Sequence, residues 1–148
     1  GKAPLSEGFA VFREFLQIKP DLHVGGQVRN GTTKGIDEYA LAAYNAPFPD
    51  DDHKQGVRQF PNLVPGTPRT PSAEPNKEAW KILREWKKPF LCAFSDKDPI
   101  FSGVENSFYK LIPGCKDMPH VTIQNAGHFL QEDQPNACVE AILSIKDI

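Results

Sequence analysis

Two short apolar runs, with helical patterns around them, constrain the fold of this chain more than any other feature. Residues 90–94 (FLCAF) form a continuous apolar run, which is typical of a strand buried on both faces of a parallel sheet. Residues 121–123 (VTI) form the second candidate strand. Helical patterns precede, separate and follow these runs, so the order helix–strand–helix–strand–helix predicts an α/β fold with a parallel sheet.

The three helices of this second part have their own sequence signals. Pro75 suits a first helical turn, and apolar residues at helical spacing follow over 79–86. A second helix is predicted over 104–112, where a Pro-Gly pair ends it. Asp133 and Pro135 are predicted to start the last helix.

The chain is expected to be part of a longer protein. It begins at Gly1, its single methionine is Met118, and two strands alone do not make a buried parallel sheet. We therefore expect the missing strands upstream of Gly1. A removed tag or leader is the alternative explanation for the missing start residue.

The first part of the chain predicts short helices joined by loops, without a convincing strand. Ser6 is placed to cap a helix whose apolar face contains Phe9, Phe12 and Leu16. A Gly- and Asn-rich stretch over 25–35 is expected to interrupt helical structure. This part therefore reads as a helical layer that lies on another element.

Two more helices and a proline-rich segment follow. A helix is expected over 36–43, and Asp51 or Asp52 is expected to cap another that runs toward Phe60. Five prolines between residues 61 and 75 favour an extended linker, because proline ends helices and cannot donate ladder hydrogen bonds. The chain is thus predicted to divide into a helical region over 1–64, a Pro-rich linker over 65–75 and an α/β region over 76–148.

Charge and cysteine content exclude several classes of function. The chain has 17 Lys and Arg against 19 Asp and Glu, a formal net charge of −2. This balance, without a basic stripe, argues against nucleic acid or an anionic membrane as the main partner. Apolar stretches are too short for a membrane span. Three cysteines without C-x-x-C spacing favour free thiols in a reducing compartment, so a cytoplasmic location is expected.

Two loops contain the candidate catalytic residues. Residues 95–99 (SDKDP) follow the first strand and residues 125–129 (NAGHF) follow the second. Ligands of open α/β sheets bind at the carboxyl ends of the strands, and parallel strands place both loops at the same edge. We expect Asp98 to hold one ring nitrogen of His128, so that the other nitrogen can accept a proton. Asp96 is a competing candidate for the carboxylate.

Other candidate groups have weaker signals. His23, His53 and His120 lack the spacing of a metal site, and neither a metal nor a cofactor is expected. The pair 25–26 (GG) lies between helices rather than after a strand, so it is not a phosphate loop. Cys92, within its strand, is expected to be unreactive core.

Three passages resemble the haloalkane dehalogenases of the α/β-hydrolase fold, most closely the subfamily whose cap supplies a halide-binding tryptophan. Residues 43–50 (AYNAPFPD) and 56–61 (GVRQFP) resemble the cap signature of that family. Residues 94–99 (FSDKDP) resemble the loop of its catalytic acid, and residues 126–133 (AGHFLQED) the loop of its catalytic histidine. The resemblance covers nearly the whole chain but only about the C-terminal half of the family's fold, namely the cap and the last two strands with their helices.

The resemblance implies a reaction and a role for individual residues. In that family an aspartate expels halide from a haloalkane, and a histidine activates water against the resulting alkyl ester. His128 matches this general base and Asp98 the triad acid, whereas the nucleophile is expected upstream, so the chain alone is expected to be inactive. The implied partners are an apolar haloalkane, the halide product and the N-terminal half of the fold. The matching substrate-pocket positions are Phe9, Phe12, Phe60, Pro61, Val64 and Ile100.

One departure keeps other functions open. The cap tryptophan of the family falls on Phe12, whose phenyl ring has no N–H to donate to a leaving halide. An epoxide hydrolase of the same fold would instead use tyrosine hydroxyls, for which Tyr39 and Tyr44 are available. A serine esterase would need an upstream G-x-S-x-G. A non-catalytic truncated relic would also retain these passages.

Overall fold

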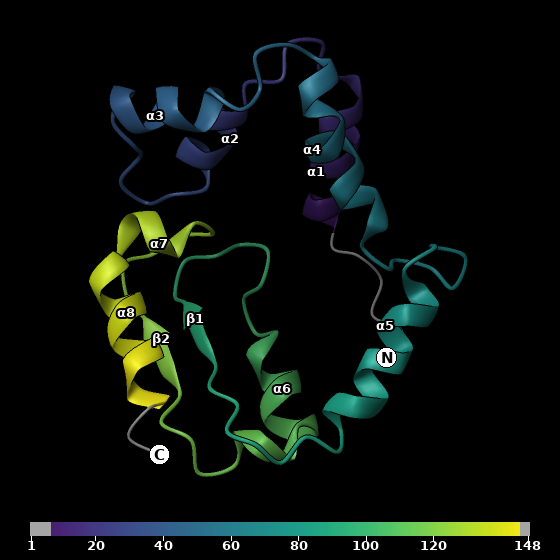
Figure 1. Ribbon diagram of the computed structural model, residues 1–148, viewed down its shortest axis with the longest axis vertical. Coiled ribbons are helices and arrows are strands. Elements are labelled where there is room, and N and C mark those ends of the chain that lie inside the picture. The colour runs from purple at the N-terminus through teal and green to yellow at the C-terminus, as the bar shows by residue number, and fades with distance from the viewer. Residues whose placement is uncertain (1–6, 146–148) are drawn as a thin grey trace. The chain divides into compact units, whose positions relative to one another are not determined.

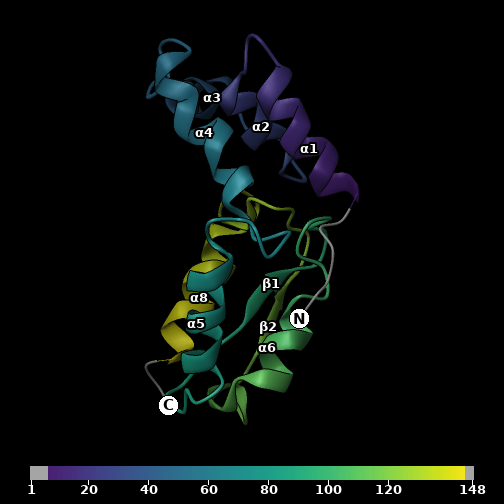
Figure 2. The ribbon, with the colours of Figure 1, turned by 90° about the vertical axis from the view of Figure 1, so that its right-hand side faces the viewer.

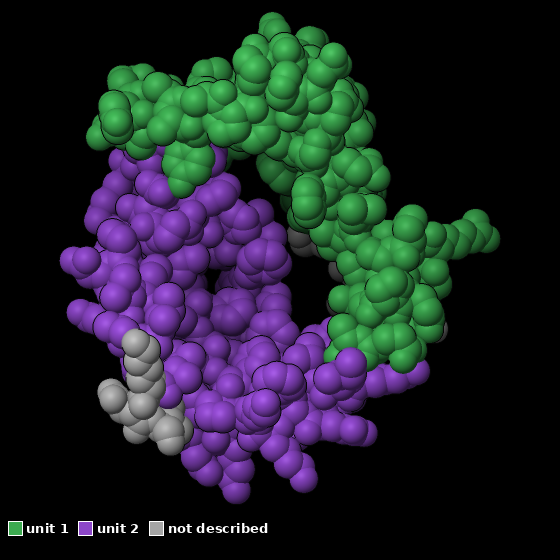
Figure 3. Space-filling model, viewed as in Figure 1, with its two compact units in different colours: residues 1–27, 37–79 green, residues 28–36, 80–148 purple. Residues whose placement is uncertain are grey.

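The computed structural model describes residues 7–145, which divide into two compact units (Figure 3). Unit 1 contains the residues up to 27 together with 37–79, and unit 2 contains Val28–Ile36 together with the residues from 80 onward. The segment Val28–Ile36, which the sequence places in the helical region, therefore packs with the α/β part. The functional division into helical region, linker and α/β region stays a prediction.

Unit 1 consists of short helices and turns (Figure 1). Its elements are α1 (Glu7–Ile18), the start of α2 (Val24–Asn30), α3 (Glu38–Asn45), η1 (Asp52–Lys54), α4 (Gln55–Gln59), η2 (Phe60–Leu63) and the first residues of α5 (Ala73–Leu83). In α1, Leu16 is buried while Phe9 and Phe12 are half-buried, as the predicted apolar face requires. Ser6, its predicted cap, lies outside the described residues.

The prediction that glycines interrupt helical structure is wrong at residues 25 and 26, which lie within α2. The Gly26 N–H donates to Nδ1 of His23 at 3.1 Å, and the Gly25 N–H donates to the Asn45 side-chain oxygen at 2.9 Å. A Cβ on Gly25 would lie 2.7 Å from the carbonyl oxygen of Leu41. Glycine is therefore used here for the close approach of α2 to α3, and side chains satisfy the first amides of the helix.

The segment predicted as an extended linker forms turns instead. The Thr70 N–H donates to the Thr67 carbonyl at 3.1 Å, and the Ala73 N–H donates to the Thr70 carbonyl at 2.8 Å. Helix α5 already begins at Ala73, with Pro75 in its first turn. Proline has a fixed φ that suits turns and first helical turns as well as extended backbone, which explains the difference.

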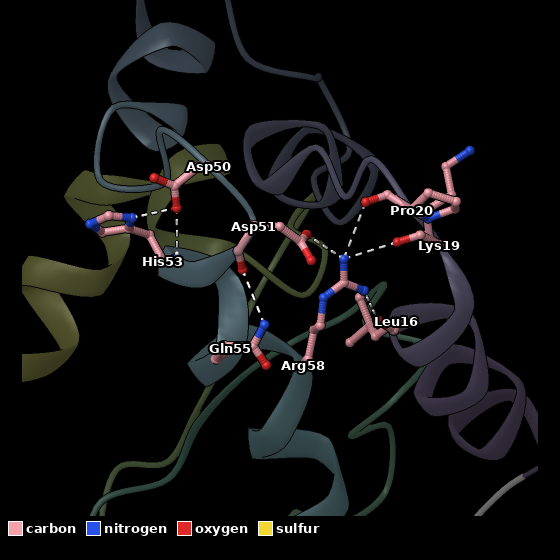
Figure 4. A network of polar contacts seen from close by, with 8 residues as sticks. All are labelled: Leu16, Lys19, Pro20, Asp50, Asp51, His53, Gln55 and Arg58. Carbon is pink, nitrogen blue, oxygen red and sulfur yellow. Dashed lines mark hydrogen bonds and ion pairs between the residues drawn. The ribbon is translucent and has the colours of Figure 1, made fainter.

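Arg58 connects α4 to the end of α1 within unit 1 (Figure 4). Its guanidinium donates to the carbonyl oxygens of Leu16, Lys19 and Pro20 and to the Asp51 carboxylate, the last at 2.7 Å. The last carbonyls of a helix lack intrahelical donors, so a guanidinium fork stabilises this end of α1. Arg58 thereby fixes α1, the helix of Phe12, against α4.

The start of η1 is capped by a different aspartate from the predicted ones. Asp50 accepts the backbone N–H of His53 at 3.1 Å and its imidazole Nδ1 at 2.6 Å (Figure 4). The bond from the His53 side chain lowers the pKa of the exposed Asp50 carboxyl. Asp51, one of the two predicted caps, makes no side-chain capping bond because its carboxylate accepts from Arg58.

Unit 2 contains a two-stranded parallel sheet between helices α6 and α8, as both ribbon views show (Figures 1 and 2). Its elements are β1 (Ala93–Ser95), α6 (Glu105–Leu111), η3 (Pro113–Cys115), β2 (Val121–Ile123), α7 (Leu130–Asp133) and α8 (Pro135–Ser144). Ala93 pairs with Val121, and Ser95 pairs with Ile123. The predicted parallel pairing is confirmed.

The first strand is shorter than the apolar run that predicts it. The Phe90 N–H donates to the Gly114 carbonyl at 3.0 Å, and the Cys92 N–H donates to Nδ1 of His120 at 3.1 Å. These amides are satisfied outside the ladder, so β1 begins only at Ala93. The predicted last helix also differs, because Asp133 ends α7 and α8 begins at Pro135.

The core of unit 2 lies on the α6 side of the sheet. Cys92, Ile112 and Cys115 are buried there, and the Trp80 ring stacks on Phe108 with ring centroids 5.7 Å apart.

Burial, and then the neighbouring Cys115, raises the pKa of the Cys92 thiol to about 12. A thiol with such a pKa is almost entirely protonated near neutrality, which makes Cys92 unsuitable as a nucleophile. Between residues 7 and 145, no helix is long and apolar enough to cross a membrane.

Candidate active site

The ends of the two parallel strands bring His128 and Asp98 together. Asp98 lies three residues after β1, and His128 lies five residues after β2. Nδ1 of His128 is 3.0 Å from Oδ2 of Asp98. The Asp98 residue is buried, at 7 % exposure, whereas the His128 side chain remains 28 % exposed. The carboxylate is therefore enclosed while the imidazole can still be reached by a ligand or by water.

The second oxygen of Asp98 is also occupied. Oδ1 accepts the backbone N–H of Ile100 at 2.7 Å. With both oxygens in use, the carboxylate plane is fixed relative to the 98–100 turn. When Nδ1–H donates to Oδ2, the free lone pair of the imidazole is on Nε2, where it can accept a proton. This arrangement has the chemistry of a general base that is oriented by a carboxylate.

Asp96, the competing candidate, has a different partner. Its Oδ1 accepts the backbone N–H of Ala126 at 3.1 Å, and this bond lowers the pKa of its exposed carboxyl. The Lys97 N–H donates to the Ala126 carbonyl at 3.0 Å, so the two loops are tied side by side. Asn125, at the start of the second loop, has a positive φ of 58°, a conformation that Asn tolerates better than most residues.

Two aromatic rings define the position of the imidazole. Phe101 stacks on His128 with ring centroids 5.5 Å apart and an interplanar angle of 29°. Phe129 meets the imidazole edge-on, with ring centroids 5.1 Å apart and an interplanar angle of 84°. Such stacked and edge-to-face contacts are favourable ring geometries, so they favour this orientation of the imidazole. Sequence reasoning missed both phenylalanines, although each lies next to a predicted site residue.

The other predicted site residues are divided between the two units. Ile100 belongs to unit 2 and contacts the site through its N–H bond to Asp98. The rest lie in unit 1: Phe9 and Phe12 on α1, Phe60 and Pro61 in η2, and Val64 directly after it. Phe60 is 74 % exposed within this chain. Their role in a substrate pocket stays a prediction.

The remaining histidines of the chain have structural partners. Nδ1 of His120 accepts the Cys92 N–H, and its Nε2 lies 2.9 Å from the Cys115 carbonyl oxygen. Both ring nitrogens are therefore in contact with backbone groups. Across residues 7–145, no three His, Cys, Asp or Glu side chains gather as they would around a metal ion.

An apolar hollow of unit 2, between the strands and α8, is lined by Leu91, Ala93 and Ile142 among others and includes neither His128 nor Asp98.

The sequence relatives of this chain are haloalkane dehalogenases. The chain is 49% identical over 134 residues to a haloalkane dehalogenase of Psychrobacter cryohalolentis, a match covering 90% of this chain and 44% of the relative. A haloalkane dehalogenase of Mycolicibacterium paratuberculosis is 41% identical over 136 residues, covering 92% and 45%. The chain thus spans about half the length of the curated relatives it matches. No family model matches the chain.

Solved structures show the same fold. The haloalkane dehalogenase DpaA from Paraglaciecola agarilytica superposes with a TM-score of 0.78 at 24% identity, over 99% of this chain and 47% of that one. A point mutant of the haloalkane dehalogenase DatA from Agrobacterium tumefaciens gives 0.74 at 18% identity, over 95% and 51%. The prediction of a cap followed by the C-terminal part of an α/β-hydrolase fold is confirmed.

Proposed function

We propose, on the premise that this chain corresponds in sequence and fold to about half of a haloalkane dehalogenase, that the whole protein hydrolyses haloalkanes to alcohol and halide. In this proposal His128 is the general base and Asp98 is the acid that orients it. The observation that supports the assignment most strongly is the 3.0 Å contact between Nδ1 of His128 and the buried Asp98 carboxylate at the ends of two parallel strands.

The proposed reaction has two steps. A carboxylate from the rest of the protein attacks the carbon that bears the halogen, and the carbon–halogen bond breaks with its electron pair leaving as halide. Water then loses a proton to Nε2 of His128 and attacks the carbonyl carbon of the resulting ester. The ester bond breaks, the leaving alkoxide takes the proton from the His128 imidazolium and departs as the alcohol, and the new carboxyl group loses its proton to solvent, which regenerates the carboxylate. One halide ion and one proton are released for each water consumed.

The substrate side of the proposal rests on apolar residues. Phe9, Phe12 and Phe60, with Pro61, Val64 and Ile100, would line a pocket for an uncharged haloalkane, and such a wall keeps water from the nucleophile during the first step. The partners are then the haloalkane, the halide product and the remaining half of the fold. Because all three cysteines are free thiols, we place the protein in the cytoplasm.

The test is a substrate comparison with the whole protein. Halide, alcohol and proton release are followed with 1-bromobutane, and the same enzyme is offered a terminal epoxide and a p-nitrophenyl ester. We expect multiple turnovers on the bromoalkane, with halide and alcohol formed in equal amounts. Turnover of the epoxide alone would indicate the epoxide hydrolase alternative, for which Tyr39 and Tyr44 are the available hydroxyls. Turnover of the ester alone would indicate an esterase.

Replacing Phe12 by tryptophan is expected to accelerate halide release. An indole N–H offers a donor to the developing halide that a phenyl ring lacks, and one oriented donor to a developing anion changes the rate by about 10²-fold. Single-turnover halide release should therefore rise by about this factor in Phe12→Trp. The matched control is Phe15→Trp on the same helix, which should leave the rate within about twofold. Equal rates for wild type and Phe12→Trp would show that Phe12 does not occupy the halide position.

A further inference from the structure

We propose that Asp133 is a positioning residue for His128, and that it works by clamping the histidine loop to the distant segment 31–34. The proposal rests on the proposed function, because it assigns a role to a residue that acts through the general base. The contacts that support it hold the backbone on both sides of His128.

The carboxylate of Asp133 bridges two stretches of chain that are about a hundred residues apart in sequence. It accepts the N–H of Gly127, the residue before His128, at 2.8 Å. It also accepts the N–H of Thr33 at 3.0 and 2.9 Å on its two oxygens and the N–H of Lys34 at 3.2 Å. The Thr33 hydroxyl lies 2.9 Å from the same carboxylate and 3.0 Å from the carbonyl oxygen of Asn125, so it can donate its one proton to either partner in the histidine loop and its helix. The loop of the general base and the 31–34 segment are therefore held by one side chain.

The other side of His128 is tied to the same segment. The N–H of Phe129 donates to the carbonyl of Gly31 at 3.2 Å. The two stretches also approach closely, because a Cβ on Gly127 would lie 2.5 Å from that carbonyl oxygen. Both neighbours of His128 are thus fixed, one through Asp133 and one through Gly31, while the His128 side chain itself points to Asp98.

The surroundings of Asp133 stabilise the charged form of its side chain. The residue is 3 % exposed, and burial by itself would raise the pKa of its carboxyl. The amides of Gly127 and Thr33 outweigh burial, so the pKa lies below its ordinary value and the group is a carboxylate at neutral pH. Its two oxygens accept the backbone N–H groups of Gly127, Thr33 and Lys34, and Lys34 Nζ donates to its backbone carbonyl at 2.9 Å. An asparagine has only one acceptor oxygen, and its NH₂ would face other donors.

The clamp predicts a specific kinetic signature. A displaced His128 backbone would lengthen the bond from Nδ1 to Asp98, and the imidazolium would lose a neighbouring negative charge. The protonated imidazole would then be less stabilised, so the rise of kcat with pH would shift toward lower pH. Because a misplacement of about 1 Å costs about 10²-fold in rate, kcat should fall by about this factor while KM changes by less than about twofold. A residue that only stabilises the fold would lower the amount of active enzyme without moving the pH midpoint.

The experiment compares Asp133→Asn with Glu140→Gln in the whole protein, using 1-bromobutane across a pH series. Glu140 is an exposed carboxylate on α8, so its neutralisation removes the same charge without touching the clamp. We expect the low-pH midpoint of kcat to move down by about half a unit or more in Asp133→Asn only. An unchanged midpoint with reduced kcat would overturn the clamp.

A second pair of variants keeps the test decisive if Asp133→Asn does not fold. Thr33→Val removes the hydroxyl that lies near Asp133 and near the Asn125 carbonyl of the histidine loop, and Thr33→Ser retains it, so we expect a downward shift of the midpoint only in the first. Equal midpoints in these two variants would contradict the clamp. The variant His128→Ala separates the two proposals: if it retains full turnover, the assigned base is wrong, whereas loss of turnover with an unmoved midpoint in the clamp variants overturns the clamp alone.

Discussion

In His128→Ala, multiple turnover of 1-bromobutane is expected to fall by about 10⁴-fold while the first halide is still released. Halide departure needs only the nucleophilic carboxylate, since no proton is transferred in that step. Hydrolysis of the ester needs water to lose a proton, and this variant lacks the imidazole that is proposed to accept it. A stopped assay should therefore show a burst of about one halide per enzyme molecule, followed by almost no further release.

The chain contains a matched control for this variant. His53 is paired with Asp50 at 2.6 Å, but both side chains are more than half exposed on unit 1. His53→Ala removes an imidazole from the same kind of pair and should leave the steady-state rate within about twofold. Continued multiple turnover in His128→Ala would remove this histidine from the mechanism. Loss of the burst as well as of turnover would show that His128 acts before halide departure.

Replacing Asp98 by asparagine is expected to lower turnover by about 10³-fold. The two oxygens of Asp98 serve two donors, the N–H of Ile100 at 2.7 Å and Nδ1 of His128 at 3.0 Å. Asparagine has one acceptor oxygen, and if that oxygen keeps Ile100, the NH₂ faces Nδ1. The imidazole then places its proton on Nε2, the nitrogen that should accept one from water.

Asp96→Asn is the control for the loss of charge in the same loop. Its carboxylate bonds the Ala126 N–H rather than His128, so a change of less than about fivefold is expected. Steady-state halide release by the two variants decides between the aspartates. If Asp96→Asn loses as much activity as Asp98→Asn, the triad acid is assigned to the wrong residue.

The pairing of His128 with Asp98 could be predicted because it follows from local rules. An apolar run and a short strand, each followed by a polar loop, place both loops at one edge of a parallel sheet. The observed strands are shorter than the run 90–94 suggests, yet their parallel direction alone is enough to bring the loops together. Helices such as α3, capped by Asp37 through the Ala40 N–H at 2.7 Å, were predictable for the same reason.

The features that could not be predicted depend on contacts between distant parts of the chain. Gly25 looks like a helix breaker until the carbonyl of Leu41 is found where its Cβ would be. Asp133 looks like a helix start, because Asp before an apolar run is a common cap, and nothing in the sequence relates it to Thr33. The prolines between 65 and 75 fit both turns and extended backbone, so their conformation depends on what packs around them.

The intact mass of the His128→Ala protein after mixing with 1-bromobutane tests the covalent mechanism directly. We expect that most of the variant gains the mass of one butyl group, that the increase persists, and that wild type under the same conditions shows no lasting increase. A peptide map should then locate the butyl ester on a carboxylate of the whole protein. Release of halide without any covalent adduct in the variant would contradict the two-step mechanism, because water would then displace the halide directly and His128 would not be acting on an ester.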